Sequence, residues 1–258
     1  MHLSRGRPHR GLRGIVGGYA DFGERTGSPR ETSEVPGRGV VVIVDLDNGW
    51  TVEGERFGSF AGGLYPRPVR VRHEGSSRAV QFDVEPPAVR CLLGVPAGEL
   101  AQRTVALDDL LGVEAARVAE RLHGAPDARS RFVILDEILL RCLARSSAAT
   151  RPDVDHAWAL LRASRGRIRI AELAAALGCS RRHLAKRFAE DVGAPPKLAG
   201  RLIRLECARA RLGSVPLARL AAEHGFADQA HLTREFRALA GAPPTKFPNL
   251  QDDGDPAA

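Results

Sequence analysis

The sequence predicts an α+β protein made of two parts. We expect a small β-roll or barrel-like domain with helices in the N-terminal half, and an all-α domain of two helix-turn-helix units joined by a long helix after it. Three observations predict this architecture. Short β-branched runs separated by Gly, Pro and Ser fill residues 17–84, an apolar helical pattern recurs twice after residue 168, and positive charge is concentrated around that recurrence. A chain of 258 residues is long enough for two domains.

The first 14 residues are rich in arginine but lack an apolar run. Arg5, Arg7, Arg10 and Arg13 stand among Gly, Pro and His. This composition predicts a disordered basic arm over residues 1–14, with an ordered nucleic-acid-binding arm as the alternative.

The strand candidates follow in order. Val40–Val44 is a continuous β-branched run that ends at the turn-forming segment Asp45–Gly49. Further strands are expected at Trp50–Val52, Val69–His73 and Ala79–Val84. Short strands at this spacing are typical of a small antiparallel roll or barrel.

Two helices are predicted after the strands, at Val113–Leu122 and Ala128–Arg145. The second carries an apolar stripe, which suits either the core or a dimer contact. Its members are Phe132, Leu135, Leu139 and Leu143. We therefore expect a regulatory or dimerisation domain over residues 15–147 and a linker at 146–153.

The region from Ile168 to Phe247 contains one pattern twice. Gly178 recurs as Gly225, 47 residues later, whereas Phe188 recurs as Phe236, 48 residues later. The one-residue shift falls in the turn between two helices, where insertions are tolerated. Two helix-turn-helix units are predicted, joined by a helix at Leu198–Leu212. We assign residues 148–250 to this DNA-binding domain and expect a disordered tail at 251–258.

Each copy has the local signals of two helices and a turn. Ser180 and Asp228 suit the N-cap of the second helix of each unit, and Gly178 can end the first helix in a left-handed conformation. A bundle that merely contains a repeat is the alternative, but the caps and stops repeat together with the apolar pattern.

The positive charge belongs to the repeated region. Residues 1–150 hold 20 Arg and Lys against 19 Asp and Glu, whereas residues 151–250 hold 18 against 9. A net +9 over a double helix-turn-helix pattern indicates a surface that binds the phosphates of double-stranded DNA.

The second copy resembles the DNA-binding domain of AraC/XylS-type transcriptional regulators. The resemblance rests on Ala221-Ala222, Gly225-Phe226, Asp228-Gln229, Leu232, Arg234, Phe236, Gly241 and Pro244. It implies a sequence-specific regulator, activator or repressor, that presents two recognition helices to successive major grooves. More loosely, Phe60–Leu64, Leu92–Pro96 and Leu107–Gly112 are similar to the N-terminal domain of a group of actinobacterial AraC-type regulators. That similarity implies a sensor or dimerisation domain with an unknown small-molecule effector.

The outward faces of the two recognition helices supply the candidate DNA contacts. The candidates for base contact are Arg182, Ala185, Lys186, Gln229, Ala230, Thr233 and Arg234. Of these, Arg182, Ala185 and Lys186 also match the family's base-contacting positions. The candidates for phosphate contact are Arg181, Arg187, His183, His231, Arg237 and Lys246. We also expect the arginines of the connecting helix (Arg201, Arg204, Arg209 and Arg211) to contact phosphates mainly.

The remaining features bear on competing classes of function. The cysteines Cys91, Cys142, Cys179 and Cys207 are scattered, and His73 is the only histidine of the β region, so we predict no metal or other cofactor. The alternative is an enzyme or alkyl-transfer sensor fused to the same DNA-binding module, which needs a reactive cysteine in an electropositive setting. We expect no catalysis, no membrane contact and a cytoplasmic location. A homodimer and RNA polymerase are left open as further partners.

Overall fold

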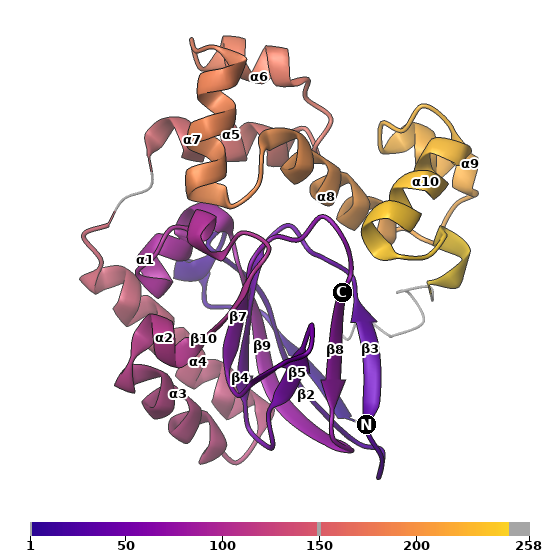
Figure 1. Cartoon of the computed structure of the whole chain (residues 1–258). Coiled ribbons are helices and arrows are strands. Elements are labelled where there is room, and N and C mark those ends of the chain that lie inside the picture. Colours follow the sequence, from indigo (N-terminus) through magenta and orange to yellow (C-terminus); the bar gives the residue numbers. More distant parts are fainter. Residues whose placement is uncertain (1, 149–150, 248–258) are drawn as a thin grey trace.

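The computed structural model describes residues 2–148 and 151–247, and it places the strands in the N-terminal half and a helical region in the C-terminal half (Figure 1). The strands are β1 (His2–Gly6), β2 (Val16–Arg25), β3 (Arg30–Glu34), β4 (Val40–Asp45), β5 (Trp50–Val52), β6 (Glu55–Phe57), β7 (Phe60–Gly62), β8 (Val69–His73), β9 (Ser76–Val84) and β10 (Thr104–Ala106). They form two antiparallel sheets, ordered β1-β2-β9-β4-β7-β10 and β3-β8-β5-β6. The α+β prediction is confirmed.

Strand β9 lies inside the larger sheet and shows how the two sheets face each other. Phe82 and Val84 belong to the main core, whereas Gln81 and Asp83 point to the other face and line a cavity between the sheets. This follows from the two-residue period of a strand. Val41 of β4 lies opposite Asp83 in the ladder and lines the same cavity.

Helices cover the outer face of the larger sheet. They are η1 (Arg10–Leu12), η2 (Pro86–Ala88), α1 (Val89–Leu93), η3 (Ala97–Leu100), α2 (Leu107–Leu111), α3 (Val113–His123) and α4 (Ala128–Arg145). On α4, the buried Arg131 pairs with the buried Asp21 of β2 at 2.6 Å and also donates to two backbone carbonyls. Leu135 and Leu139 are buried below it, so the α4 stripe packs in the core.

The N-terminal residues differ from the prediction. Residues 2–6 form strand β1, which pairs along its length with β2, and Leu12 is fully buried. The disordered arm expected at 1–14 is therefore wrong for the described residues 2–14. Backbone pairing at the sheet edge and the burial of Leu12 hold this segment in place. Strands β2 and β3 were not foreseen, because glycines interrupt the first and charged residues fill the second.

The C-terminal half consists of helices α5 (Pro152–Ala163), α6 (Ile170–Ala176), α7 (Arg181–Val192), α8 (Pro196–Arg209), α9 (Leu217–Glu223), α10 (Gln229–Ala240) and η4 (Pro244–Lys246). Helix α8 lies between the pairs α6–α7 and α9–α10 (Figure 1). Helix α8 begins at Pro196, two residues before the predicted Leu198, because proline suits a first helical turn. It ends three residues before the predicted Leu212. Gly178 and Gly225 adopt left-handed φ angles of 62° and 73° in the two turns. Part of the predicted linker and all of the tail at 251–258 lie outside the described residues.

The two halves share one hydrophobic core. A single cluster of buried residues runs from Leu12 of the N-terminal half to Ala240 of α10. Where η3 meets the end of α7, a Cβ atom added at Gly98 would lie 2.0 Å from the Glu190 carbonyl oxygen. The backbones are thus in direct contact, and α7 is held against the N-terminal half.

Candidate DNA-binding surface and a cavity beside it

Recognition helices α7 and α10 begin at matching caps. The Ser180 hydroxyl accepts a hydrogen bond from the His183 amide at 3.2 Å, and the Asp228 carboxylate accepts one from the His231 amide at 2.6 Å. Each cap satisfies a backbone donor of the first turn and fixes where the helix starts. Both predicted N-caps are confirmed.

The inward faces of the two helices are equivalent. Leu184 and Phe188 on α7, and Leu232 and Phe236 on α10, are almost wholly buried. Burial of these large apolar side chains fixes the rotation of each helix about its axis. The opposite face of each helix is consequently turned to solvent.

That outward face carries the predicted base-contact residues. Arg182, Lys186, Gln229, Ala230 and Arg234 are exposed, while Ala185 and Thr233 are half-buried beside them. The Thr233 hydroxyl donates to the Gln229 carbonyl at 2.9 Å. Its methyl group is therefore the part of the side chain free to meet a base.

The predicted phosphate-contact residues fall into two groups. Arg181, Arg237 and Lys246 are exposed, and their side chains form no hydrogen bond or ion pair with another described residue. By contrast, Arg187 pairs with Asp153 of α5 at 2.8 Å and lies 3.3 Å from the His183 ring nitrogen. His231 Nδ1 accepts a hydrogen bond from the Ala227 amide at 3.2 Å. In this second group, the side chains already stabilise the domain.

The connecting-helix arginines are also engaged within the protein. Arg201 Nε donates to Glu235 at 2.7 Å, Arg204 Nη1 donates to the Gly166 carbonyl at 2.7 Å, Arg209 lies 5.7 Å from the Phe247 ring centroid, and Arg211 pairs with Glu223. These contacts join α8 and the residues after it to both helix-turn-helix units. The phosphate contacts predicted for these four arginines would therefore compete with contacts inside the protein.

A cavity of about 730 Å³ lies between the two β-sheets. Its walls include apolar and aromatic side chains of both sheets, among them Phe22, Ile43, Trp50, Phe60 and Val71. One end is polar. It is formed by Glu34, Arg38, Asp83 and Glu85 of the N-terminal half with Glu206 and Arg209 of α8.

Buried Glu85 joins that polar end to the DNA-binding half. Its carboxylate accepts hydrogen bonds from Trp158 Nε1 at 2.8 Å and Arg38 Nη2 at 3.2 Å, and it pairs with Arg162 at 3.0 Å. Arg38 also pairs with Glu206 of α8. No sequence signal pointed to this cluster, since Glu85 and Glu206 are far apart in the chain and belong to no motif.

Other kinds of site find little support in the part of the chain that the structure describes. No group of three or more His, Cys, Asp or Glu side chains there could hold a metal ion. The four cysteines are free and half-buried, and burial raises the pKa of the Cys142 thiol. Among the described helices, none is both long and apolar enough to cross a membrane.

Comparison with known proteins agrees with this geometry. Residues 173–249 match the family model of a helix-turn-helix domain. Two crystal structures of ToxT from Vibrio cholerae have a TM-score of 0.52 at 10% identity; they cover 90% and 91% of this chain and 97% of ToxT. The C-terminal domain of AraT from Geobacillus stearothermophilus is 20% identical and covers 42% of this chain and 94% of its own, with a TM-score of 0.37. No curated protein matches the sequence.

The two capped helices, their buried inner faces and the family match define a helix-turn-helix DNA-binding protein. The helix-turn-helix match is of the AraC type, and the whole chain has the fold of ToxT. The C-terminal half is accordingly a helix-turn-helix DNA-binding domain of the AraC/XylS type.

Proposed function

We propose that the protein is a transcriptional regulator of the AraC/XylS type that reads two successive major grooves with α7 and α10. Its N-terminal half controls this binding in response to a small molecule. The observation that carries the proposal is the equivalence of the two helices. Each has a capped N-terminus, a buried apolar face and an exposed polar face. Helix-turn-helix proteins use this arrangement to present the start of the second helix to base edges.

Within this proposal the two helices read different bases. On α7, Arg182 and Lys186 suit guanine, with Ala185 against a thymine methyl group. On α10, Gln229 suits adenine and Arg234 suits guanine, with Ala230 and Thr233 as apolar neighbours. Arg181, Arg237 and Lys246 contact phosphates. Each monomer site is therefore asymmetric.

The effector occupies the cavity between the sheets. ToxT, whose fold this chain shares, has been crystallised with an unsaturated fatty acid and with a naphthalenyl butenoic acid. In this chain Glu206 and Arg209 of α8 form part of the cavity end, and Glu85 reaches Trp158 of α5. A ligand that displaces these side chains changes contacts of the DNA-binding half directly.

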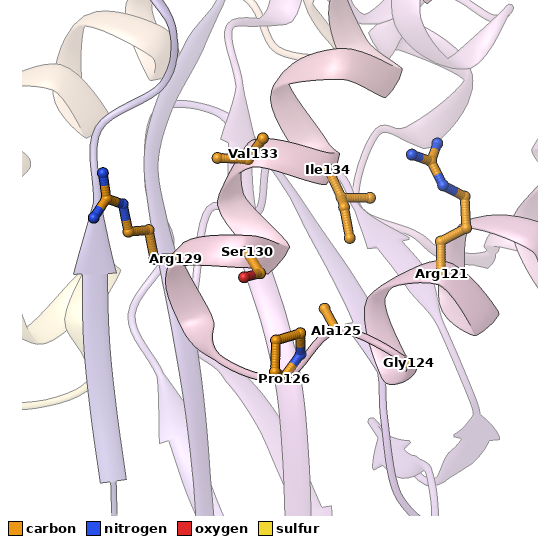
Figure 2. A pocket seen from close by; sticks show the side chains of 8 residues that line it. All are labelled: Arg121, Gly124, Ala125, Pro126, Arg129, Ser130, Val133 and Ile134. Atoms are coloured by element: carbon orange, nitrogen blue, oxygen red, sulfur yellow. The ribbon is translucent and has the colours of Figure 1, made fainter.

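A homodimer formed through α3 and α4 is the proposed assembly. Of the three large apolar side chains that are strongly exposed among the described residues, Val113 lies on α3 and Val133 on α4. A hollow between the end of α3 and the start of α4 is lined by Pro126, Val133 and Ile134 (Figure 2).

RNA polymerase contact accompanies promoter binding. The protein acts in the cytoplasm and has no catalytic role.

The test is binding-site selection from random duplexes with the full chain, followed by footprinting. We expect an asymmetric site with protection of two major grooves on one side of the duplex, about 10 bp apart. A short palindrome bound through one helix of each subunit would contradict the proposed docking. Sedimentation of wild type and Val133→Glu tests the dimer, which the added charge should dissociate.

A further inference from the structure

The polar end of the cavity holds more carboxylates than arginines, and Asp83 is a carboxylate there that forms no ion pair with another described residue. Arg38 is paired with both Glu85 and Glu206, and Arg162 also pairs with Glu85. Arg209 lies over Phe247 and interacts electrostatically with Glu34. Among the described residues, Asp83 forms no ion pair within 4.0 Å; its side-chain hydrogen bond is to Gln81. A negative charge is thus left over.

The position of Asp83 keeps this carboxylate open to the cavity. It lies on the inward face of β9 beside Gln81, opposite Val41 of β4. Glycines flank it: a Cβ atom added at Gly17 would lie 3.4 Å from Asp83 Cβ and 3.9 Å from its Oδ2. Larger residues at this point would cover the carboxylate.

The surroundings of Asp83 disfavour the negative charge of its carboxylate. Burial, with a further contribution from nearby Glu85, raises the pKa of Asp83 to about 6, although Arg38 and the Gln81 hydrogen bond act in the opposite direction. A cation placed at Asp83 would relieve this penalty. A carboxylate placed there would face Asp83, Glu34 and Glu85 together.

The rest of the cavity suits an apolar body. The rings of Phe22, Trp50 and Phe60 and the side chains of Val52 and Val71 line it. Its volume of about 730 Å³ is that of an ordinary small-molecule site. Aromatic faces also attract cations.

We propose that the cavity binds an aryl- or alkylamine, whose ammonium group pairs with Asp83 and whose apolar body lies between the two sheets. This inference rests on the proposed effector role of the cavity and specifies the chemical class of the ligand.

The experiment is isothermal titration calorimetry of the full chain at pH 7.5 with three probes of one shape: 4-phenylbutylamine, 4-phenylbutan-1-ol and 4-phenylbutanoic acid. The amine should bind tightest and the acid weakest, with a difference of about tenfold or more, as expected for one charge-assisted hydrogen bond. Asp83→Asn, which keeps the size of the side chain, should remove most of the preference for amine over alcohol. The control Asp109→Asn changes an exposed carboxylate on α2 and should keep the preference.

Three results would overturn the assignment: acid binding as tight as amine binding, an unchanged amine preference in Asp83→Asn, or no binding of any probe. DNA binding to the selected site is measured on the same preparations. A protein that binds its site but prefers no amine would refute the ligand class alone. A protein that binds no specific site would refute the proposed function.

Discussion

The indole nitrogen of Trp158, in the first helix of the DNA-binding half, donates a 2.8 Å hydrogen bond to Glu85, the residue that follows β9. Both side chains are buried. Glu85 lies two residues from Asp83 and lines the cavity with it. One hydrogen bond therefore connects the polar end of the cavity to the core of the DNA-binding half.

Replacing Glu85 should destabilise the whole chain. Glu85→Ala leaves Arg38 and Arg162 without their shared carboxylate and Trp158 Nε1 without an acceptor. We expect a loss of about 2–3 kcal/mol in the free energy of unfolding, below the range for fully buried pairs because both arginines keep some solvent contact. Urea unfolding measures it. Exposed Glu120→Ala on α3 is the control and should stay within about 0.5 kcal/mol of wild type.

Arg234 and Arg237 on α10 should separate base reading from phosphate binding. Arg234→Ala should cost about 1–3 kcal/mol on the selected site and flatten the preference at one base pair. Arg237→Ala should weaken selected and random duplexes alike and reduce the salt slope by about one. Site selection and salt titrations of both variants measure this. The same uniform loss in both variants would refute the proposed docking of α10.

Arg182 on α7 should behave as Arg234 does. Arg182→Ala should relax the preference at a second position, about one helical turn from the first. The matched control is Arg181→Ala. Arg181 is the residue before Arg182, and its exposed side chain is assigned to phosphate contact. If selection with Arg182→Ala returned the wild-type site unchanged, α7 would not read bases through this residue.

The N-cap of α10 should contribute to both stability and DNA binding. Asp228→Ala removes the acceptor of the His231 amide and should cost about 1 kcal/mol, whereas Asp228→Asn keeps a cap and should cost much less. Thermal unfolding and affinity for the selected site measure the pair. Equal stability of the two variants would show that the cap is not what fixes the start of α10.

His224 should make stability depend on pH. It is buried at the end of α9, and burial lowers the pKa of its imidazole, with Arg211, Arg165 and Arg167 adding repulsion and Glu223 opposing. The unfolded chain then takes up the proton first, so stability falls as the pH drops below the ordinary histidine value of about 6.5.

The measurement is the change in unfolding free energy between pH 7.5 and pH 5.5 for wild type and His224→Asn. In the variant the fall in stability should disappear and give way to a small rise, because Asp83, whose pKa is raised to about 6, titrates in the same range with the opposite sign. Identical pH profiles for the two proteins would show that His224 titrates normally.

The DNA-binding half expressed alone should be less stable than within the whole chain. A fragment of residues 150–258 loses the contacts of Trp158 with Glu85 and of α7 with η3, and exposes part of the shared core. We expect it to fold and bind the selected site, with a lower melting temperature than the full chain. A fragment that is insoluble while the full chain binds would show that the half depends on the N-terminal core.

Local sequence patterns were sufficient for the helix-turn-helix units. Ser180, Asp228 and Gly178 act on the backbone of their own turn, and the spacing of Leu184 and Phe188 fixes the inner face of one helix. Such signals span a few residues, so they can be recognised without knowing the fold. The same signals named the outward residues of α7 and α10, whose DNA contacts remain predictions.

The tertiary structure decided what depends on distant residues. Pairing with β2 orders residues 2–6, although their own composition resembles a disordered arm. Asp153 pairs with Arg187, and other groups of the folded chain likewise bind arginines of α8 that the sequence assigned to phosphates. Asp83, Glu85 and Glu206 line one cavity, where Arg38 pairs with both Glu85 and Glu206 of α8. The sequence does not show which charged side chains will pair with each other, so this cluster could be identified only from the packing of the two halves.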